Sequence, residues 1–416
     1  MAFPVEPTHL VVAQPHLGPL LTALDEARER SGDTAGPWYA APRTSDVLGL
    51  ALVPLPDPER VAAGLRTWVS PGRPAEPEQG GPALDRVLRH LRAGFASRYF
   101  GWTPLLGKNR LVGRIHGPRR PSGVSGAGEV SHGGGGAPRA ITPPSWATGR
   151  TAVTPGGVTV GLVDTAMVNH DYLAGAWTGP FAAAAEGRPA DAEGGHATFI
   201  AGLIHRHAPA ATVRVHPVLD GAGDADVWTA AHRIVEAGRA GADVLNLSFV
   251  CYTEDGGGPL VLATALERLG RDTVVVAAAG NHGHLKDGQD HRPAFPAAFP
   301  NVIAVGATDA PYSAKGPWIT VLAPGTDLES TYLSGAVSVW EDPDGEGPAP
   351  AGRHDQIFHG YARWSGTSFA AAVVSAMIAD RTVPGRVRAA EASARLLGPA
   401  LLEGKPVRLD PRDAPA

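Results

Sequence analysis

The sequence predicts an α/β fold, with a parallel β-sheet covered by helices on both faces and a small α+β N-terminal domain before it. Between about residues 150 and 310, short runs of β-branched and small apolar residues alternate with longer segments of helical periodicity. This alternation is typical of buried strands joined by crossover helices. A shorter strand and helix pattern precedes residue 100. The 416 residues are 43% hydrophobic, which is enough for two such cores.

The N-terminal unit is predicted to occupy residues 1–120. Its elements are expected in the order strand, helix, strand, helix, near residues 9–13, 19–30, 46–53 and 58–69. After a proline-rich joint at residues 71–82, a further helix carries apolar residues on one face, namely Leu84, Val87, Leu88 and Leu91.

A short basic stretch follows, from Lys108 to Arg120, and it leads into a glycine-rich tract at residues 123–136. Tracts of this composition bury no core and behave as flexible connectors. We therefore interpret residues 121–148 as a linker, with an anion-docking site in the basic stretch as the alternative.

The second unit is predicted to span residues 149–405, with residues 406–416 as a C-terminal tail. Its strands are expected near residues 158–163, 212–218, 243–248, 273–278 and 301–307. Its helices are expected near residues 197–206, 226–240 and 259–269. Residues 330–362 are polar and contain glycine and proline, so they predict a long loop.

Four polar residues stand where predicted strands end or helices begin. Asp164 and Asn281 each end a buried strand. His196 opens a helix after two glycines, and Ser368 opens an apolar helix after Gly366-Thr367. Taken singly, each is ordinary cap or turn chemistry. Together they supply a nucleophile, a base, a carboxylate to orient the base and an amide donor for an oxyanion, so they predict a hydrolytic site.

At these four places the chain resembles the subtilisin-like serine proteases, over about residues 150–405. The matching motifs are Val163-Asp164-Thr165, Gly195-His196-Ala197-Thr198, Ala279-Gly280-Asn281 and Ser365-Gly366-Thr367-Ser368. The resemblance implies a subtilisin-like fold and a serine endopeptidase with the catalytic triad Asp164, His196 and Ser368. It also implies that Asn281 donates to the oxyanion hole. Separately, the strand and helix order of the N-terminal unit resembles the architecture of the prodomains of such proteases, with no motif in common.

The same resemblance implies two walls of a substrate groove, formed by Ser248, Phe249 and Val250 and by Ala278, Ala279 and Gly280. In the stretch from Asn246 to Cys251 the family generally carries Ser-Leu-Gly-Gly, whereas this chain has side chains where those glycines leave room. We therefore predict a narrower choice of protein or peptide substrates. Two alternatives stay open at this point. One is a dedicated processing protease for one partner or precursor peptide, and the other is a catalytically silent peptide-binding homologue.

No cofactor is expected. Asp342-x-Asp344-Gly345 is only a fragment of a calcium loop, and His282, His284 and His291 are interpreted as a polar surface loop rather than metal ligands. The single cysteine, Cys251, is expected to be a small buried apolar residue.

Charge and hydropathy indicate where the protein acts. The net charge of −5 argues against nucleic-acid binding. The sequence shows neither a signal-peptide pattern nor an apolar run long enough to span a bilayer, so we expect a cytoplasmic protein without a membrane partner.

Overall fold

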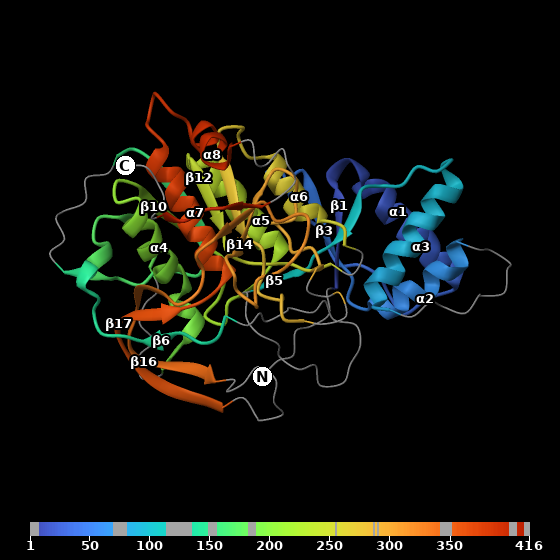
Figure 1. Ribbon diagram of the computed structural model, residues 1–416. Helices are drawn as coiled ribbons and strands as arrows, with labels where there is room; N and C mark the ends of the chain where they lie inside the picture. The colour runs from blue at the N-terminus through green and yellow to red at the C-terminus, as the bar shows by residue number, and fades with distance from the viewer. Residues whose placement is uncertain are drawn as a thin grey trace.

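The computed structural model describes residues 8–69, 81–113, 135–148, 156–181, 189–253, 256–285, 288, 291–341, 352–398 and 406–411. Its centre is an eight-stranded sheet in which every neighbouring pair of strands is parallel (Figure 1). The strands in spatial order are β18 (Val407–Arg408), β15 (Val321–Ala323), β14 (Ile303–Ala307), β13 (Val274–Ala278), β12 (Val244–Leu247), β7 (Thr159–Asp164), β10 (Thr212–Pro217) and β8 (Trp177–Thr178).

Helices cover both faces of this sheet. One face carries α4 (His196–His207), α7 (Thr367–Arg381) and α8 (Ala389–Leu397), and the other carries α5 (Val227–Arg239) and α6 (Leu260–Glu267). Side chains alternate between the two faces along each strand. On β13, Val276 packs with α4 and α7 while Ala277 packs with α5 and α6. The predicted fold class is therefore confirmed.

Helix α7 is the central helix of this unit. Every residue from Thr367 to Ala379 is buried, so no face of these turns meets solvent. A helix that is apolar all round belongs inside a core, which matches the run of alanine and valine that the sequence places there.

The prediction of a long loop at residues 330–362 is wrong. The structure shows a hairpin of β16 (Leu328–Glu341) and β17 (Gly352–Trp364), paired antiparallel with a bulge between Thr331 and Ser334. Apolar side chains such as Val337 and Val339 alternate with polar ones and pack inward, which favours strand over loop. The sheet also includes β6 (Arg139–Ala140) and β9 (Ala190–Asp191). Asp342 and Asp344 lie outside the described residues.

The N-terminal unit is a four-stranded sheet covered by three helices. Its strands in spatial order are β2 (Arg43–Ser45), β3 (Leu50–Pro54), β1 (His9–Ala13) and β4 (Leu106–Lys108). Its helices are α1 (Leu17–Ser31), α2 (Pro58–Val69) and α3 (Ala83–Arg98). The strand expected at residues 46–53 begins only at Leu50, because Gly49 turns the chain in the left-handed region at a φ of 68°.

This N-terminal sheet lies between its own helices and the second unit (Figure 1). On β1, Leu10 and Val12 face the N-terminal helices, whereas Val11 joins the core around α5 and α6. The Oγ of Ser45 also lies 2.8 Å from Nε2 of His232 on α5. The contact is completed by β5 (Leu111–Gly113), which pairs with β11 (Asp224–Asp226).

Lys108 belongs to the basic stretch that was expected to be solvated, but the structure shows it otherwise. It ends β4, its side chain is buried, and its Nζ lies 2.6 Å from Asp85 Oδ1. The ammonium group is therefore used in a structural ion pair rather than offered to an anion. Short 3-10 turns complete the description, namely η1 (Gln14–His16), η2 (Ser145–Ala147), η3 (Asp171–Leu173) and η4 (Ala192–Gly195).

Among the helices of the described residues, none combines the length and the apolar character needed to cross a membrane.

Candidate active site

Asp164 and His196 meet at the carboxyl end of the sheet. Asp164 is the last residue of β7, and His196 is the first residue of α4. The Nδ1 of His196 lies 2.8 Å from Oδ1 and 2.9 Å from Oδ2 of Asp164, and both residues are buried. An ionised carboxylate only accepts hydrogen bonds, so Nδ1 carries the proton and Nε2 of the neutral ring keeps its lone pair.

The turn around Asp164 is tied to α4. The N–H of Thr165 donates to Oδ1 of Asp164 at 2.7 Å, and the N–H of Ala197 donates to Oγ1 of Thr165 at 3.1 Å. Before His196, a Cβ built on Gly195 would lie 2.3 Å from the ring of Tyr332. Only glycine therefore lets the chain enter α4 at this point.

The buried ring of Tyr332 packs against this turn. Burial raises the pKa of its phenol well above the ordinary value, so the hydroxyl stays neutral. The hydroxyl donates to the carbonyl of Ala192 in the 3-10 turn before His196.

Ser368 is the second residue of α7, at the helix end whose dipole favours negative charge. Its hydroxyl donates to the carbonyl of Ser248 at 3.4 Å. In return the Ser248 hydroxyl donates to the carbonyl of Ser368 at 3.1 Å. The side chain of Asn246 joins Ser248 at 2.8 Å and Ser375 at 3.0 Å, so buried hydrogen bonds hold α7 against β12.

Two aromatic rings bring the histidine and the serine turn together. The ring of His196 lies with its centroid 5.7 Å from that of Trp364 and 5.6 Å from that of Phe369. Trp364 comes shortly before Ser368 in the chain, and Phe369 directly follows it. His196 is therefore packed against both flanks of the turn that carries Ser368.

Asn281 is held in one orientation by Thr367. Its Oδ1 accepts from the N–H and from the Oγ1 of Thr367, both at 2.9 Å. The Thr367 Oγ1 in turn accepts from the N–H of Gly280 at 3.1 Å. These contacts turn Nδ2 of Asn281 toward the serine turn, where a Cβ built on Gly366 would lie 3.3 Å from it.

The residues expected to wall the groove are all buried, but their apolar side chains pack in different clusters, and Ala279 packs separately with Ala314 and Ile319. Ser248 is bonded to the Ser368 backbone, and Ala278 to Gly280 lead directly to Asn281. Phe249 and Cys251 pack into the core around α5 and α6, as Cys251 was expected to do. Val250 and Tyr252 face the core that contains α7.

The prediction of a polar surface loop is wrong for His282. This side chain is buried, with Nδ1 2.8 Å from the hydroxyl of Tyr252 and Nε2 3.0 Å from the carbonyl of Arg292. A Cβ built on Gly280 would lie 2.7 Å from Nδ1 of His282 and 2.9 Å from the Tyr252 hydroxyl. The pair therefore fills the space beside the Gly280 wall.

Sequence reasoning missed Thr367, Trp364 and Tyr252 as parts of this site. Thr367 lies within a recognised motif, but only its contact with Asn281 reveals its task. Trp364 and Tyr252 carry no local signal, because large aromatic residues are common in any core.

Metal ligation finds no support in the parts of the chain that the structure describes, where no three His, Cys, Asp or Glu side chains gather. Burial lowers the pKa of His284, which favours its neutral form.

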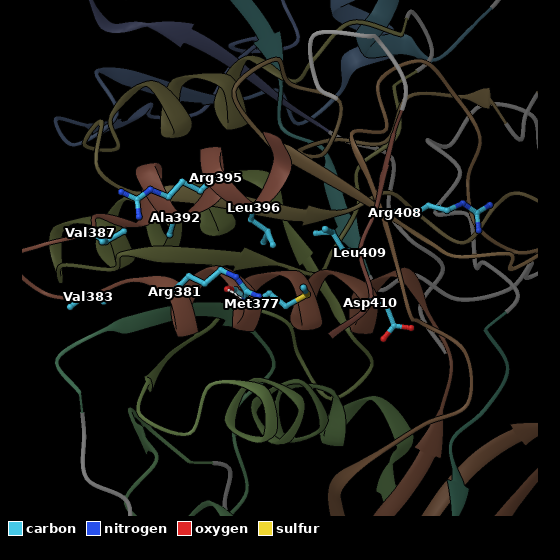
Figure 2. A pocket seen from close by; sticks show the side chains of 10 residues that line it. All are labelled: Met377, Arg381, Val383, Val387, Ala392, Arg395, Leu396, Arg408, Leu409 and Asp410. Atoms are coloured by element: carbon cyan, nitrogen blue, oxygen red, sulfur yellow. Dashed lines mark hydrogen bonds between the residues drawn. The ribbon is translucent and has the colours of Figure 1, made fainter. Parts of the chain in front are cut away.

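A pocket of about 660 Å³ lies at the opposite end of α7 from Ser368 (Figure 2). The residues that line it come from α7, α8 and β18 and their flanking segments. Two of its three arginines form ion pairs, Arg395 with Glu391 and Arg408 with Asp309, and the third, Arg381, donates to the carbonyl of Met377. None of Asp164, His196 and Ser368 lines this pocket. The charges of Arg395 and Arg408 are already paired, so neither arginine is available to bind an anion there.

Comparison with known proteins agrees with this geometry. The subtilase family model matches residues 156–382, more than half of the chain. Thermophilic serine proteinase of Bacillus sp. strain AK1 is 36% identical over 163 residues, which is 35% of this chain and 36% of that protein. Subtilisin Savinase of Lederbergia lenta is 32% identical over 43% of this chain and 68% of its own length. Thermitase of Thermoactinomyces vulgaris is 33% identical over 42% of this chain and 66% of its own length.

Solved structures with partial similarity include a lanthipeptide protease and the prenylagaramide maturation protease PagA. The first is 24% identical with a TM-score of 0.46 and covers 58% of this chain and 80% of that one. The second is 24% identical with a TM-score of 0.42, and the match covers 54% of this chain and 75% of that one. With its matching family domain and its Asp164–His196 pair beside the Ser368 turn, the chain belongs to the subtilase family.

Proposed function

We propose that this chain is a serine endopeptidase in which Ser368 attacks the carbonyl carbon of a peptide bond. The observation that carries the proposal is the buried contact of His196 with both oxygens of Asp164, packed against the turn that bears Ser368. Family membership supports the same reaction class.

His196 acts first as base and then as acid. Because Asp164 holds Nδ1, the lone pair of Nε2 takes the proton from the Ser368 hydroxyl as its oxygen bonds to the carbonyl carbon. The imidazolium that forms is stabilised by Asp164 and returns the proton to the leaving amine. Water then repeats the sequence on the acyl-enzyme, which releases the acid and regenerates the serine.

The negative charge of the tetrahedral intermediate falls on the former carbonyl oxygen. The N–H of Ser368 at the start of α7 and Nδ2 of Asn281 are the donors we assign to it. Thr367 fixes the amide of Asn281 before the reaction begins, so the donor does not need to reorient.

A fluorophosphonate probe tests the proposal, since it reacts only with an activated serine. Wild-type protein should become labelled and Ser368→Ala should not. Ser393→Ala is the matched control, because Ser393 lies on α8 and bonds only to its own helix at the carbonyl of Ala390. Absence of labelling in the wild type would favour the catalytically silent homologue.

A second, narrower candidate is a dedicated processing protease for one precursor peptide. Its support is the volume of the Val250 side chain, which faces the core that contains α7 and lies in the stretch where the family generally carries glycines. Profiling on a peptide library decides between the two. Cleavage after many residue types would speak for a general endopeptidase.

A further inference from the structure

Residues 135–141 run along the strand that leads into the serine turn. β6 pairs antiparallel with β17, so that Ala140 lies opposite Ala362 and Arg139 opposite Arg363. The N–H of Ile141 continues this pairing with the carbonyl of Tyr361 at 3.3 Å. The segment therefore lies on the strand as an added edge, which is how many proteins bind extended peptides.

Gly135 lies at the proposed catalytic centre. A Cβ built on it would come within 2.1 Å of the carbonyl oxygen of Ser365 and within 3.5 Å of Nδ2 of Asn281. No side chain fits in such space, so only glycine reaches this position. From Gly135 the segment runs antiparallel to β17, so it moves away from the serine turn as its residue numbers rise. We infer that residues following a scissile bond take this course.

The residues after Gly135 are held by their own contacts. Nε1 of Trp364 donates to the carbonyl of Gly136 at 2.9 Å. Pro138 is buried, and Ala137 and Ala140 pack against the core that contains α7.

Arg139 forms an ion pair with Asp327 at the beginning of the β16–β17 hairpin. Asp327 adopts a φ of 51°, a left-handed value that is rare for a residue other than glycine, and its N–H donates to Oγ of Ser365 at 2.8 Å. The neighbouring acid, Glu329, pairs with Arg363 instead. Asp327 is thus the acidic group aimed at the segment.

We propose that the edge of β17 and Asp327 form a binding site for the leaving-group side of an extended peptide. The peptide it takes has a glycine at the catalytic centre and a basic residue four positions later. Residues 135–140 of the chain are its resident ligand, and a peptide substrate takes the same place. The inference rests on the proposed endopeptidase, because only a protease has a leaving-group side.

The two recognition elements differ in strength. Arg139 and Asp327 are 64% and 56% exposed, and exposed ion pairs contribute little, so the charge should change binding by about two- to fivefold. The selection for glycine at position 135 is steric, so we expect that any residue with a Cβ is excluded from it.

The binding part is tested without catalysis, in full-length Ser368→Ala protein. Hydrogen exchange over residues 136–141 should be slow in this parent. Adding Gly135→Ala should accelerate it at least tenfold, because the new methyl group collides with the Ser365 carbonyl. Adding Asp327→Asn should accelerate it about two- to fivefold.

Matched controls are Gly270→Ala, where a Cβ meets nothing within 4 Å, and Glu329→Gln, which removes an acid on the same strand that pairs elsewhere. Both should exchange like the parent. The inference is overturned if the parent exchanges as fast as the free hexapeptide Gly-Gly-Ala-Pro-Arg-Ala, or if Gly135→Ala behaves like Gly270→Ala.

The substrate part uses internally quenched peptides that end in Gly-Gly-Ala-Pro-Arg-Ala or in the same sequence with glutamate for arginine. Wild-type enzyme should show a kcat/KM about two- to fivefold higher for the arginine peptide. The preference should vanish in Asp327→Asn and persist in Glu329→Gln. Equal cleavage of both peptides by the wild type refutes the inference. Cleavage of neither, with slow exchange in the first experiment, refutes the proposed function instead.

Discussion

Trp364 stands edge-on to His196, with ring centroids 5.7 Å apart and ring planes at 83°. The same indole donates its N–H to Gly136 and is almost completely buried. One side chain therefore contacts both the proposed base and the resident segment, so its packing and its hydrogen bond are separable by mutation.

Trp364→Phe should retain most of the packing and lose the donor, at a cost of about 1 kcal/mol in the free energy of unfolding. Trp364→Ala should cost about 3–5 kcal/mol, because it leaves a cavity beside His196. Denaturant unfolding of the Ser368→Ala background measures both. Equal losses would mean that the ring itself contributes nothing.

Asn281→Ala should lower kcat with little change in KM, since its amide meets a charge that exists only after attack. For this donor in subtilisin, a member of the same family, the loss is about 10²–10³. Steady-state kinetics on a fluorogenic peptide measures the effect. If Asn281→Ala kept the wild-type kcat, Asn281 would be a turn residue without a role in catalysis.

Thr367→Val should disorient Asn281 without touching substrate, because it removes the hydroxyl that bonds both Oδ1 of Asn281 and the N–H of Gly280. A kcat loss of about 5- to 150-fold corresponds to the 1–3 kcal/mol of a buried group left unsatisfied. Thr367→Ser keeps the hydroxyl and should restore most of the rate. If the serine variant is as slow as the valine variant, the positioning role is wrong.

Tyr252→Ala should broaden the choice of substrate residues, since the Tyr252 hydroxyl and His282 fill the space beside Gly280. Cys251 belongs to the stretch that the sequence predicts to narrow the groove, but it is not the residue to change, because it faces the opposite core. Tyr252→Phe removes only the hydroxyl and should broaden the library profile less than Tyr252→Ala does. An unchanged profile in Tyr252→Ala would contradict the prediction.

The N-terminal unit is expected to act as an inhibitory or folding-assisting segment until the chain is cut between residues 123 and 144. A tethered segment meets its site at about millimolar effective concentration, so modest affinity is enough. Intact-mass measurement should show the wild type shortening with time while Ser368→Ala stays whole. A wild type that remains uncut and fully active would instead favour a permanent substrate-recruiting domain.

Local pattern predicted the central architecture well, because each βα unit of this sheet is specified by contiguous apolar residues. Asp164, His196 and Ser368 could be proposed from sequence because they sit at or next to element ends, which are visible in sequence. Asn281, proposed on the same ground, lies three residues beyond the end of β13. The β16–β17 hairpin was missed because its polar outer residues and glycines mask the alternation of its inner face.

Other features depend on contacts between distant parts of the chain. Gly135 belongs to a tract that is indistinguishable from a linker until Ser365 is placed beside it. Lys108 was interpreted as solvated because its ion-pair partner, Asp85, is distant in the sequence.

The burial of α7 on every side ties the nucleophile to the whole core. Helices that lie at a surface open by local fluctuation, whereas we expect the buried turns of α7 beyond Ser368 to become exposed only when the unit unfolds globally. Heating should therefore abolish activity and tertiary structure in one cooperative step, with no inactive but folded state below the melting temperature. An inhibitor that acts by distorting Ser368 would have to work against the stability of the entire unit.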